Sequence, residues 1–281
     1  MSLSGLSPVG QFIYAQKNEL SSAQTYFKEN RTLQRNVDTF QKNAPNITTT
    51  KQLMGDYASN QVVLGAYNLS SMANQTALER DLLSQDPADK TSVAGKSGNA
   101  SWLSFADAFS TLGKGKGTAD ATPFTNESID LTTKAYQLQQ YETSDSLQKN
   151  GVGDALYFSR KMQGGKIKTV DQLMSDKTLL KVAEVVSGYE PDQFGALDFS
   201  QQKRIITNKV DLSKLQTPDQ INRYAQRYLA QLQIHPEYNK PDKPATMMDL
   251  FGGSGDGDSV LSLFGDTSGN SDYGSQLASL F

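Results

Sequence analysis

The sequence predicts an all-α fold made of two duplicated helical units of about 90 residues each, with a flexible N-terminus and a disordered C-terminal tail. Apolar side chains recur with helical spacing, most clearly at Trp102, Phe105, Ala106 and Phe109, which stand at i, i+3, i+4 and i+7. No segment keeps the alternation of apolar and polar residues that a half-buried strand requires. In addition, three segments of the first half return in the second half.

The repetition fixes the expected architecture. TTKQLM at 49–54 returns as TVDQLM at 169–174, and both copies carry Gln three residues after the first Thr. This spacing is typical of a capping box, in which side chain and backbone satisfy each other at a helix start. The paired segments are 49–54 with 169–174, 101–109 with 220–228, and 27–36 with 141–150, at offsets of 120, 119 and 114 residues.

Helical periodicity is expected over 11–42, across the N-terminal segment and the start of the first unit, and Pro45 ends it. A helix then starts at Thr49, and another follows Ser71. The stripe at 102–109 supplies the last helix of the unit, and its apolar residues are expected in the core.

The second unit is expected to open with a long polar helix over about 127–149. The second capping box, at Thr169, starts the next helix, and a further helix is expected near 203–208. Thr217 is followed by Pro218, and Gln220 stands at the box position, a combination that favours a helix start.

The expected domain organisation follows from these elements and from changes in composition. It comprises an N-terminal segment that is loose and then helical (1–25), helical unit one (26–112), a Gly/Lys-rich linker (113–125), helical unit two (126–234) and an acidic Gly/Ser-rich tail (235–281).

The composition excludes several classes of function. The 281 residues include no cysteine, so disulfides, thiolate nucleophiles and Cys-type zinc sites are ruled out. The net charge is -3 and basic residues are dispersed, which argues against a nucleic-acid partner. No apolar run is long enough to predict membrane insertion. The N-terminus lacks the basic and apolar regions of a cleaved secretory signal, so any export is expected to use a route without cleavage.

The tail offers the one candidate for partner binding. It is rich in Gly, Ser and Asp and is expected to stay disordered alone, because it cannot bury enough apolar surface to offset the entropy of ordering. Isolated Leu-Phe pairs interrupt it, and exposed apolar pairs favour docking into a groove of another protein. The candidate partner-binding residues are Leu250, Phe251, Leu263, Phe264, Leu280 and Phe281.

Other constellations predict no catalytic, cofactor-binding or metal-binding residue. The single histidine, His235, lies in a Pro-rich exit from a helix, and Glu184 is a lone carboxylate between apolar residues. The Gly/Lys run at 113–117 lacks the Lys-Ser/Thr ending of a phosphate-binding loop. The Gly/Asp run at 252–258 resembles one copy of a calcium-binding repeat, but its aspartates are shifted by one position and a single copy cannot stack. No cofactor and no metal are expected.

The ordered segments also resemble the domain-of-unknown-function family 1217. The residues that carry the resemblance are VLGAYNLSSMANQTALERDLLSQDP at 63–87, WLSFADAFS at 102–110, LQQYETSDSLQKNGVGDALYFSRK at 138–161, DQLMSDKTLLKVAEVVSG at 171–188 and KRIITNKVDLSKLQTPDQINRYAQRYLAQ at 203–231. The family has no catalytic or binding motif to transfer, and the tail lies outside its pattern.

The resemblance implies a gene context, because proteins of this family are typically found in flagellar gene regions of alphaproteobacteria. The expected function is therefore that of a non-enzymatic structural or assembly protein of the bacterial flagellum, which binds other flagellar proteins and is located in the flagellum or exported by its route. The absence of cysteine and the abundance of Gln (24) and Asn (15) are consistent with this. A cytoplasmic regulator or export chaperone that binds a flagellar subunit is the alternative. A cell-wall-modifying enzyme, suggested by Glu184 alone, is a remote one.

Overall fold

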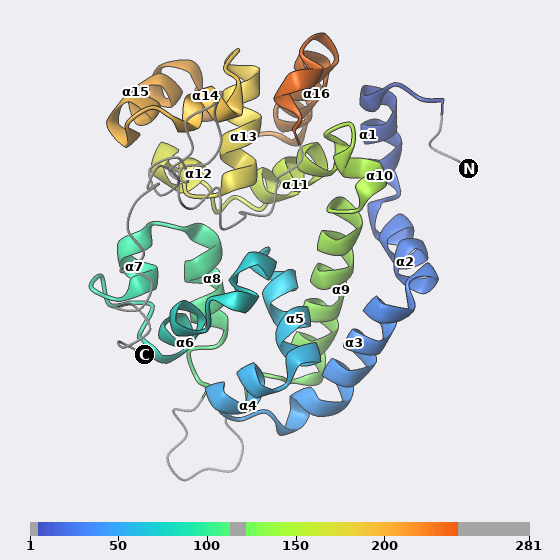
Figure 1. Cartoon of the computed structure of the whole chain (residues 1–281), viewed down its shortest axis with the longest axis vertical. Helices are drawn as coiled ribbons and strands as arrows, with labels where there is room; N and C mark the ends of the chain where they lie inside the picture. The colour runs from blue at the N-terminus through green and yellow to red at the C-terminus, as the bar shows by residue number, and fades with distance from the viewer. Residues whose placement is uncertain (1–4, 113–121, 241–281) are drawn as a thin grey trace, which may run out of the picture. The chain divides into compact units, whose positions relative to one another are not determined.

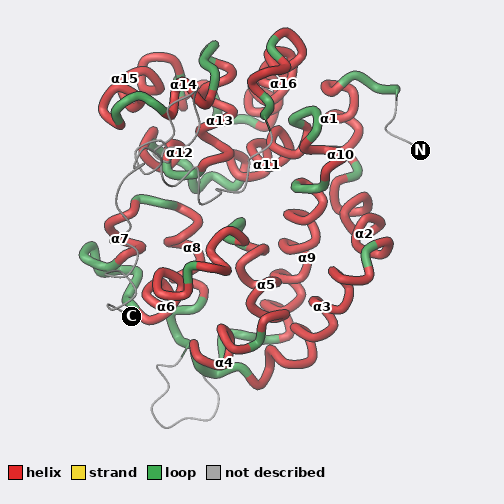
Figure 2. The backbone as a smooth tube through the Cα atoms, viewed as in Figure 1, coloured by secondary structure: helices red, strands yellow, loops and turns green. Residues whose placement is uncertain are grey.

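The computed structural model describes residues 5–112 and 122–240. Within these residues the chain forms α-helices and short 3-10 helices and no strand, so the predicted all-α fold is confirmed (Figure 2). The predicted linker (113–125) is described only from residue 122, and the Leu-Phe pairs of the tail lie outside the described residues.

Apart from α8 and α9, consecutive helices follow one another with short connections (Figure 1). Those before residue 113 are α1 (Pro8–Lys17), α2 (Glu19–Glu29), α3 (Arg31–Asn43), α4 (Thr50–Gly55), α5 (Tyr57–Ala66), α6 (Thr76–Ser84), α7 (Val93–Ser97) and α8 (Ala100–Ala108). Those after residue 121 are α9 (Asn126–Glu142), α10 (Asp145–Gln148), α11 (Val152–Gln163), α12 (Val170–Met174), α13 (Lys177–Val186), α14 (Pro191–Gly195), α15 (Phe199–Lys209) and α16 (Pro218–Ile234).

Local signals explain most helix boundaries. Thr49 and Thr169 both form complete capping boxes, with their hydroxyls accepting from the backbone N–H of Gln52 and Gln172. Thr217 forms a third. The expected helical stretch over 11–42 is instead divided into α1, α2 and α3, because Asn18 and Asn30 leave helical geometry.

The expected polar helix over 127–149 is also shorter than predicted. It ends at Glu142, and Ser144 then starts the separate short helix α10. The break lets α11 turn across the end of α9, where a Cβ at Gly153 would meet the backbone oxygen of Glu142. Glycine at 153 therefore permits the close crossing of these two helices.

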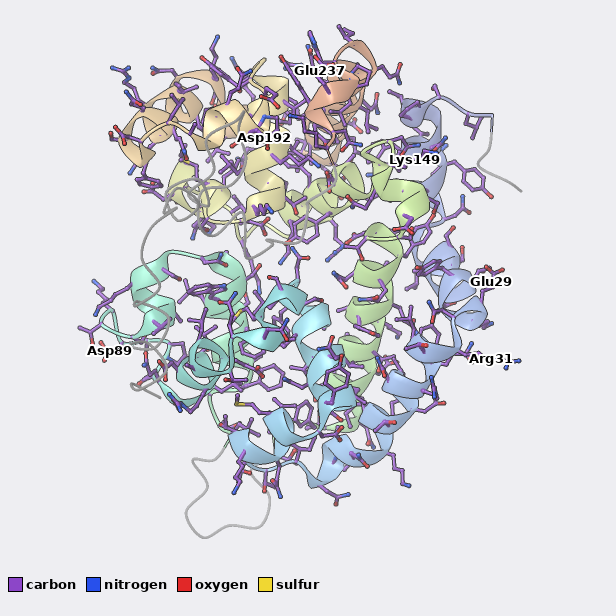
Figure 3. The ribbon with its side chains drawn as sticks, in the orientation of Figure 1. Glu29, Arg31, Asp89, Lys149, Asp192 and Glu237 are labelled. Carbon is purple, nitrogen blue, oxygen red and sulfur yellow. The ribbon has the colours of Figure 1, made fainter. Side chains whose placement is uncertain are left out.

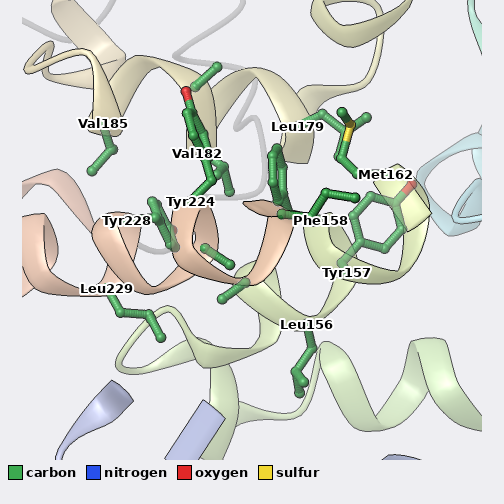
Figure 4. Packing of buried hydrophobic residues seen from close by; sticks show 14 of the residues in the cluster. Leu156, Tyr157, Phe158, Met162, Leu179, Val182, Val185, Tyr224, Tyr228 and Leu229 are labelled. Atoms are coloured by element: carbon green, nitrogen blue, oxygen red, sulfur yellow. The ribbon is translucent and has the colours of Figure 1, made fainter. Parts of the chain in front are cut away.

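Buried apolar residues form two clusters. The first core lies among α3, α5, α6, α8 and the first part of α9, and Phe40, Leu64 and Phe105 are fully buried in it. The second core is formed chiefly by α1, α11, α13 and α16. In it Phe158 stacks on Tyr224 with ring centroids 5.3 Å apart (Figure 4).

Two helices connect parts of the chain that are distant in sequence. α9 contributes Ile129 and Tyr136 to the first core and Tyr141 to the second. α1 contributes Phe12 to the second core, and it packs on α11 and α16. Helix α1 is therefore part of the second core.

Charged side chains cover the outside of the helices. Six that the structure exposes are Glu29, Arg31, Asp89, Lys149, Asp192 and Glu237 (Figure 3). This distribution is that of a helical protein whose polar faces meet water.

The two halves have one locally similar pair of helix starts. α5 and α13 both have ten residues, begin 120 residues apart, and are capped by Asp56 and Asp176. Together with the boxes at Thr49 and Thr169, this makes the α4–α5 and α12–α13 pairs locally alike. Duplication of complete units stays a prediction.

Candidate functional site

The candidate functional site is a cavity of about 350 Å³ between helices of the two cores. Its volume lies at the lower end of the range typical of small-ligand pockets. One wall comes from α5, α8 and α9, and includes Tyr67, Ser101 and Leu131. The other comes from the end of α11, the loop after it and the start of α13, and includes Lys161 and Asp176.

A buried ion pair lies beside the cavity, and its cation, Arg160, lines the wall. Arg160, in the last turn of α11, donates from Nε and Nη2 to the two carboxylate oxygens of Glu142, at 2.8 and 2.5 Å. Glu142 is only 1% exposed, so its charge depends on this bidentate contact for compensation. The pair fixes α11 to the end of α9.

Glu19 at the start of α2 completes this cluster. Burial, and then the negative charge of Glu142, raise the pKa of Glu19 to about 8, while the charge of Arg160 opposes the shift. Glu19 is therefore protonated at neutral pH. It lines a second cavity of about 400 Å³, which shares Arg160 and Gly164 with the first.

A neutral carboxyl beside an ionised one resembles an acid–base pair. Here, however, both oxygens of Glu142 accept from the Arg160 guanidinium, so this carboxylate is engaged in a structural ion pair. The cluster of Glu19, Glu142 and Arg160 instead holds α2, α9 and α11 together.

Lys161 is the incompletely bonded cation of the site. Its Nζ donates to Ser101 Oγ at 3.3 Å and lies 5.5 Å from the centroid of the Tyr157 ring. Burial lowers the pKa of Lys161, and the nearby charge of Asp176 partly opposes this. An ammonium has three donors, so most of its bonding capacity remains available.

Asp176 has the opposite character, because its oxygens are already occupied. Oδ1 accepts the backbone N–H of Thr178 and of Leu179, and Oδ2 accepts the hydroxyl of Tyr157 at 2.6 Å. The burial of Tyr157 and the charge of Asp176 raise the pKa of that phenol, which stays a donor. These contacts fix the start of α13 against α11.

A direct polar contact joins the first-core side to the second-core side beside the cavity. Asn99, the cap of α8, donates from Nδ2 to the backbone oxygen of Ser175 at 2.6 Å. Ser175 Oγ in turn contacts the backbone oxygen of Gly98 at 3.3 Å. These contacts therefore join the two walls at one edge of the cavity.

A polar cluster closes the second cavity. Asn222 Oδ1 on α16 accepts from Gln16 Nε2 at 2.6 Å, Ser159 Oγ at 2.7 Å and Gln163 Nε2 at 3.2 Å. α1, α11 and α16 are thereby connected by one acceptor.

The residues considered from sequence lie elsewhere. Glu184 on α13 is 5% exposed, and burial raises its pKa to about 7, opposed by the charge of Lys181. His235 is exposed and stacks on Tyr238, with Nδ1 at 3.1 Å from Glu237. The partner-binding candidates Leu250, Phe251, Leu263, Phe264, Leu280 and Phe281 lie outside the described residues, as do the Gly/Lys run at 113–117 and the Gly/Asp run at 252–258.

Sequence reasoning missed the residues that the cavity brings together. Asp176 could have been found from the sequence, because it follows the capping box at Thr169 at the same distance as Asp56 follows the one at Thr49. Glu19, Arg160 and Lys161 could not, because each stands in an ordinary polar position of its helix.

Within 5–112 and 122–240, no group of three or more His, Asp or Glu side chains is placed to hold a metal ion. Over the same residues, no helix has the length and apolar character needed to cross a membrane.

Over the residues that the structure describes, the chain is all-helical, with two cores and a cavity lined by apolar and charged side chains. The sequence profile of DUF1217, described as protein of unknown function, matches residues 66–221, which is more than half of the chain. The chain therefore belongs to the DUF1217 family.

A solved structure shares the fold. A crystal structure of a protein from Agrobacterium tumefaciens matches with a TM-score of 0.68 and 20% sequence identity, over 83% of this chain and 98% of that one. At this identity the likeness concerns the fold alone. No curated protein matches the sequence.

Proposed function

We propose that the protein is a non-enzymatic component of the bacterial flagellum or of its assembly, and that it acts by binding other flagellar proteins. Membership of the DUF1217 family is the observation that carries the proposal, because the resemblance to that family implies a flagellar gene context. The absence of cysteine fits a protein that travels the flagellar export route unfolded.

The bonding of three buried acids favours a binding role over catalysis. Glu142 is paired with Arg160, and Asp176 accepts from Tyr157 and from the first N–H groups of a helix. Asp154 is held by Lys181 Nζ at 2.8 Å and by the Tyr228 hydroxyl at 2.9 Å. Carboxylates bound in this way stabilise a rigid body rather than transfer protons.

Deletion of the gene tests the proposal. We expect loss or shortening of filaments and reduced swimming, restored by the wild-type gene. A complementing copy with Leu250, Phe251, Leu263 and Phe264 changed to Ser tests whether the tail contributes, with Phe199→Ser as an exposed apolar control on α15. Normal filaments and normal swimming in the deletion strain would remove the flagellar proposal.

The cytoplasmic alternative, a regulator or export chaperone, makes a different prediction. It requires retention in the cell body and a stoichiometric complex with one flagellar subunit. Recovery of the protein from sheared filaments or from the medium, in a manner that depends on the flagellar export gate, supports the structural role and rejects the chaperone.

The remote alternative, a wall-modifying enzyme, depends on Glu184. Its burial and its pKa of about 7 are properties that a general acid requires. Release of muropeptides from purified cell wall, abolished in Glu184→Gln, would support it, and no release from the wild-type protein would reject it.

A further inference from the structure

The cavity between the cores has an uneven distribution of charge. Its cations are Arg160, Lys161 and Lys166, which all come from the last turn of α11 and the loop after it. Arg160 is neutralised by Glu142. Neither Lys161 nor Lys166 forms an ion pair with another described residue.

The acid on the cavity wall compensates Lys161 only in part and forms no ion pair with Lys161 or Lys166. Asp176 directs its oxygens to Tyr157 and to the first N–H groups of α13, and it forms no salt bridge with Lys161. Lys161 is thus a half-buried cation with one long hydrogen bond, to Ser101. A buried charge without a counter-ion is costly, and an anion placed in the cavity would compensate it.

The remaining wall has the features of a ligand site for a small amphipathic molecule. Ser101 and Ser104 on α8 offer hydroxyl groups on the side facing Lys161. Ala135 and Leu131 on α9, with Ile167 opposite, supply apolar surface. Few polar groups and a larger apolar lining are typical of small-ligand pockets.

We propose that this cavity binds an organic oxyanion, a carboxylate or phosphate carried on a short apolar group, with Lys161 and Lys166 contacting the anion and the α9 side chains contacting the apolar part. The site is independent of the flagellar role, since it rests on the geometry of the cavity alone. Ser101 and Ser104 would donate to anion oxygens that the two ammonium groups leave free.

Calorimetric and NMR titration of the full-length protein tests the site with four probes: hexanoate, hexyl phosphate, hexanol and inorganic phosphate. For ligands of this size we expect dissociation constants of about 1 mM for one or both amphipathic anions. The tighter of the two identifies the anion. Hexanol tests the apolar part without charge, and inorganic phosphate tests the charge without the apolar part, so both are expected to bind more weakly.

Variants separate the two parts of the site. Lys161→Met retains the stem and removes the charge, and we expect about tenfold weaker binding of the anionic probe. Lys166→Met, at an exposed position that does not threaten folding, is expected to weaken binding less. Ala135→Leu fills the cavity from α9 and is expected to abolish binding of both amphipathic anions.

Lys209→Met is the matched control, because it removes the same charge from the exposed end of α15. It is expected to leave binding unchanged. The proposal is overturned by the absence of saturable binding of either amphipathic anion, by equal affinity for hexanol, or by equal loss in Lys209→Met and Lys161→Met. Unchanged binding in Ala135→Leu would also overturn it, by placing the anion elsewhere.

Discussion

The two cores are held together by different chemistry, although α5 and α13 begin with the same kind of cap. In the first core, aromatic rings follow one another from Tyr67 through Phe105 and Phe109 to Phe124, with centroids 5.2 to 5.7 Å apart. Edge-to-face and tilted contacts of this kind add to the hydrophobic stabilisation of the core.

The second core contains a polar framework as well as apolar residues. Tyr228 and Lys181 both bind Asp154, Tyr157 binds Asp176, and Arg160 binds Glu142. The last two contacts lie beside the cavity. The first core therefore supplies much of the apolar wall, and the second supplies the charges, so substitutions in the second core are expected to affect both stability and binding.

The largest expected effect follows the loss of Arg160. Arg160→Met leaves Glu142 buried without a counter-ion, and we expect a loss of about 3–5 kcal/mol in the free energy of unfolding, measured in urea. The double change with Glu142→Gln is expected to recover much of this loss.

A charge pair on the first-core side provides the matched comparison. Arg80 lies 3.6 Å from Asp81, and both side chains are exposed. Arg80→Met is expected to change stability by about 0.5 kcal/mol or less. Similar losses in Arg80→Met and Arg160→Met would show that the second core does not depend on its polar framework.

The next effect is a pH dependence centred on Glu19. Its pKa is about 8 in the folded protein against 4.5 ordinarily, so the folded state keeps a proton that the unfolded state releases. The stability associated with this proton is complete below about pH 4.5 and is lost as the pH rises to about 8. Glu19→Gln, which stays neutral, is expected to exceed the wild type in stability at pH 9 by roughly 2 kcal/mol.

Thermal unfolding between pH 5 and pH 9 measures this difference. Glu142, Arg160 and Tyr141 are the charged or titratable groups around Glu19. Glu184→Gln is the control, because the pKa of Glu184 is about 7 and its contribution changes mostly at lower pH. A wild-type stability that stays constant from pH 7 to pH 9 would contradict the raised pKa of Glu19.

The sequence predicted the helix starts that depend only on residues close to one another in the chain. The boxes at Thr49, Thr169 and Thr217 form as expected, because a cap requires only a hydroxyl and a Gln three residues later. The break at Asn18 was missed, since its backbone departs from the helix without a side-chain cap.

The candidate site was not predictable in the same way. Glu19 stands more than a hundred residues before Glu142 and Arg160, and the three side chains converge only because α2 and α11 both pack against α9. No periodic pattern records that convergence. The sequence draws attention to Glu184 because its neighbours are apolar, and the structure buries this side chain. Its burial could be predicted because the burial of one helix face follows from the local residue pattern.

The smallest effect tests how far the two halves are alike. Thr49→Ala and Thr169→Ala each remove one capping box at an exposed helix start, and each is expected to cost about 1 kcal/mol. Thr→Ser at either position keeps the hydroxyl and is expected to be close to neutral. Equal losses, measured by thermal unfolding, would mean that the caps serve the same purpose in both cores. A much larger loss at Thr169, whose helix leads to Asp176 and the cavity, would instead show that the second start has become part of the polar framework.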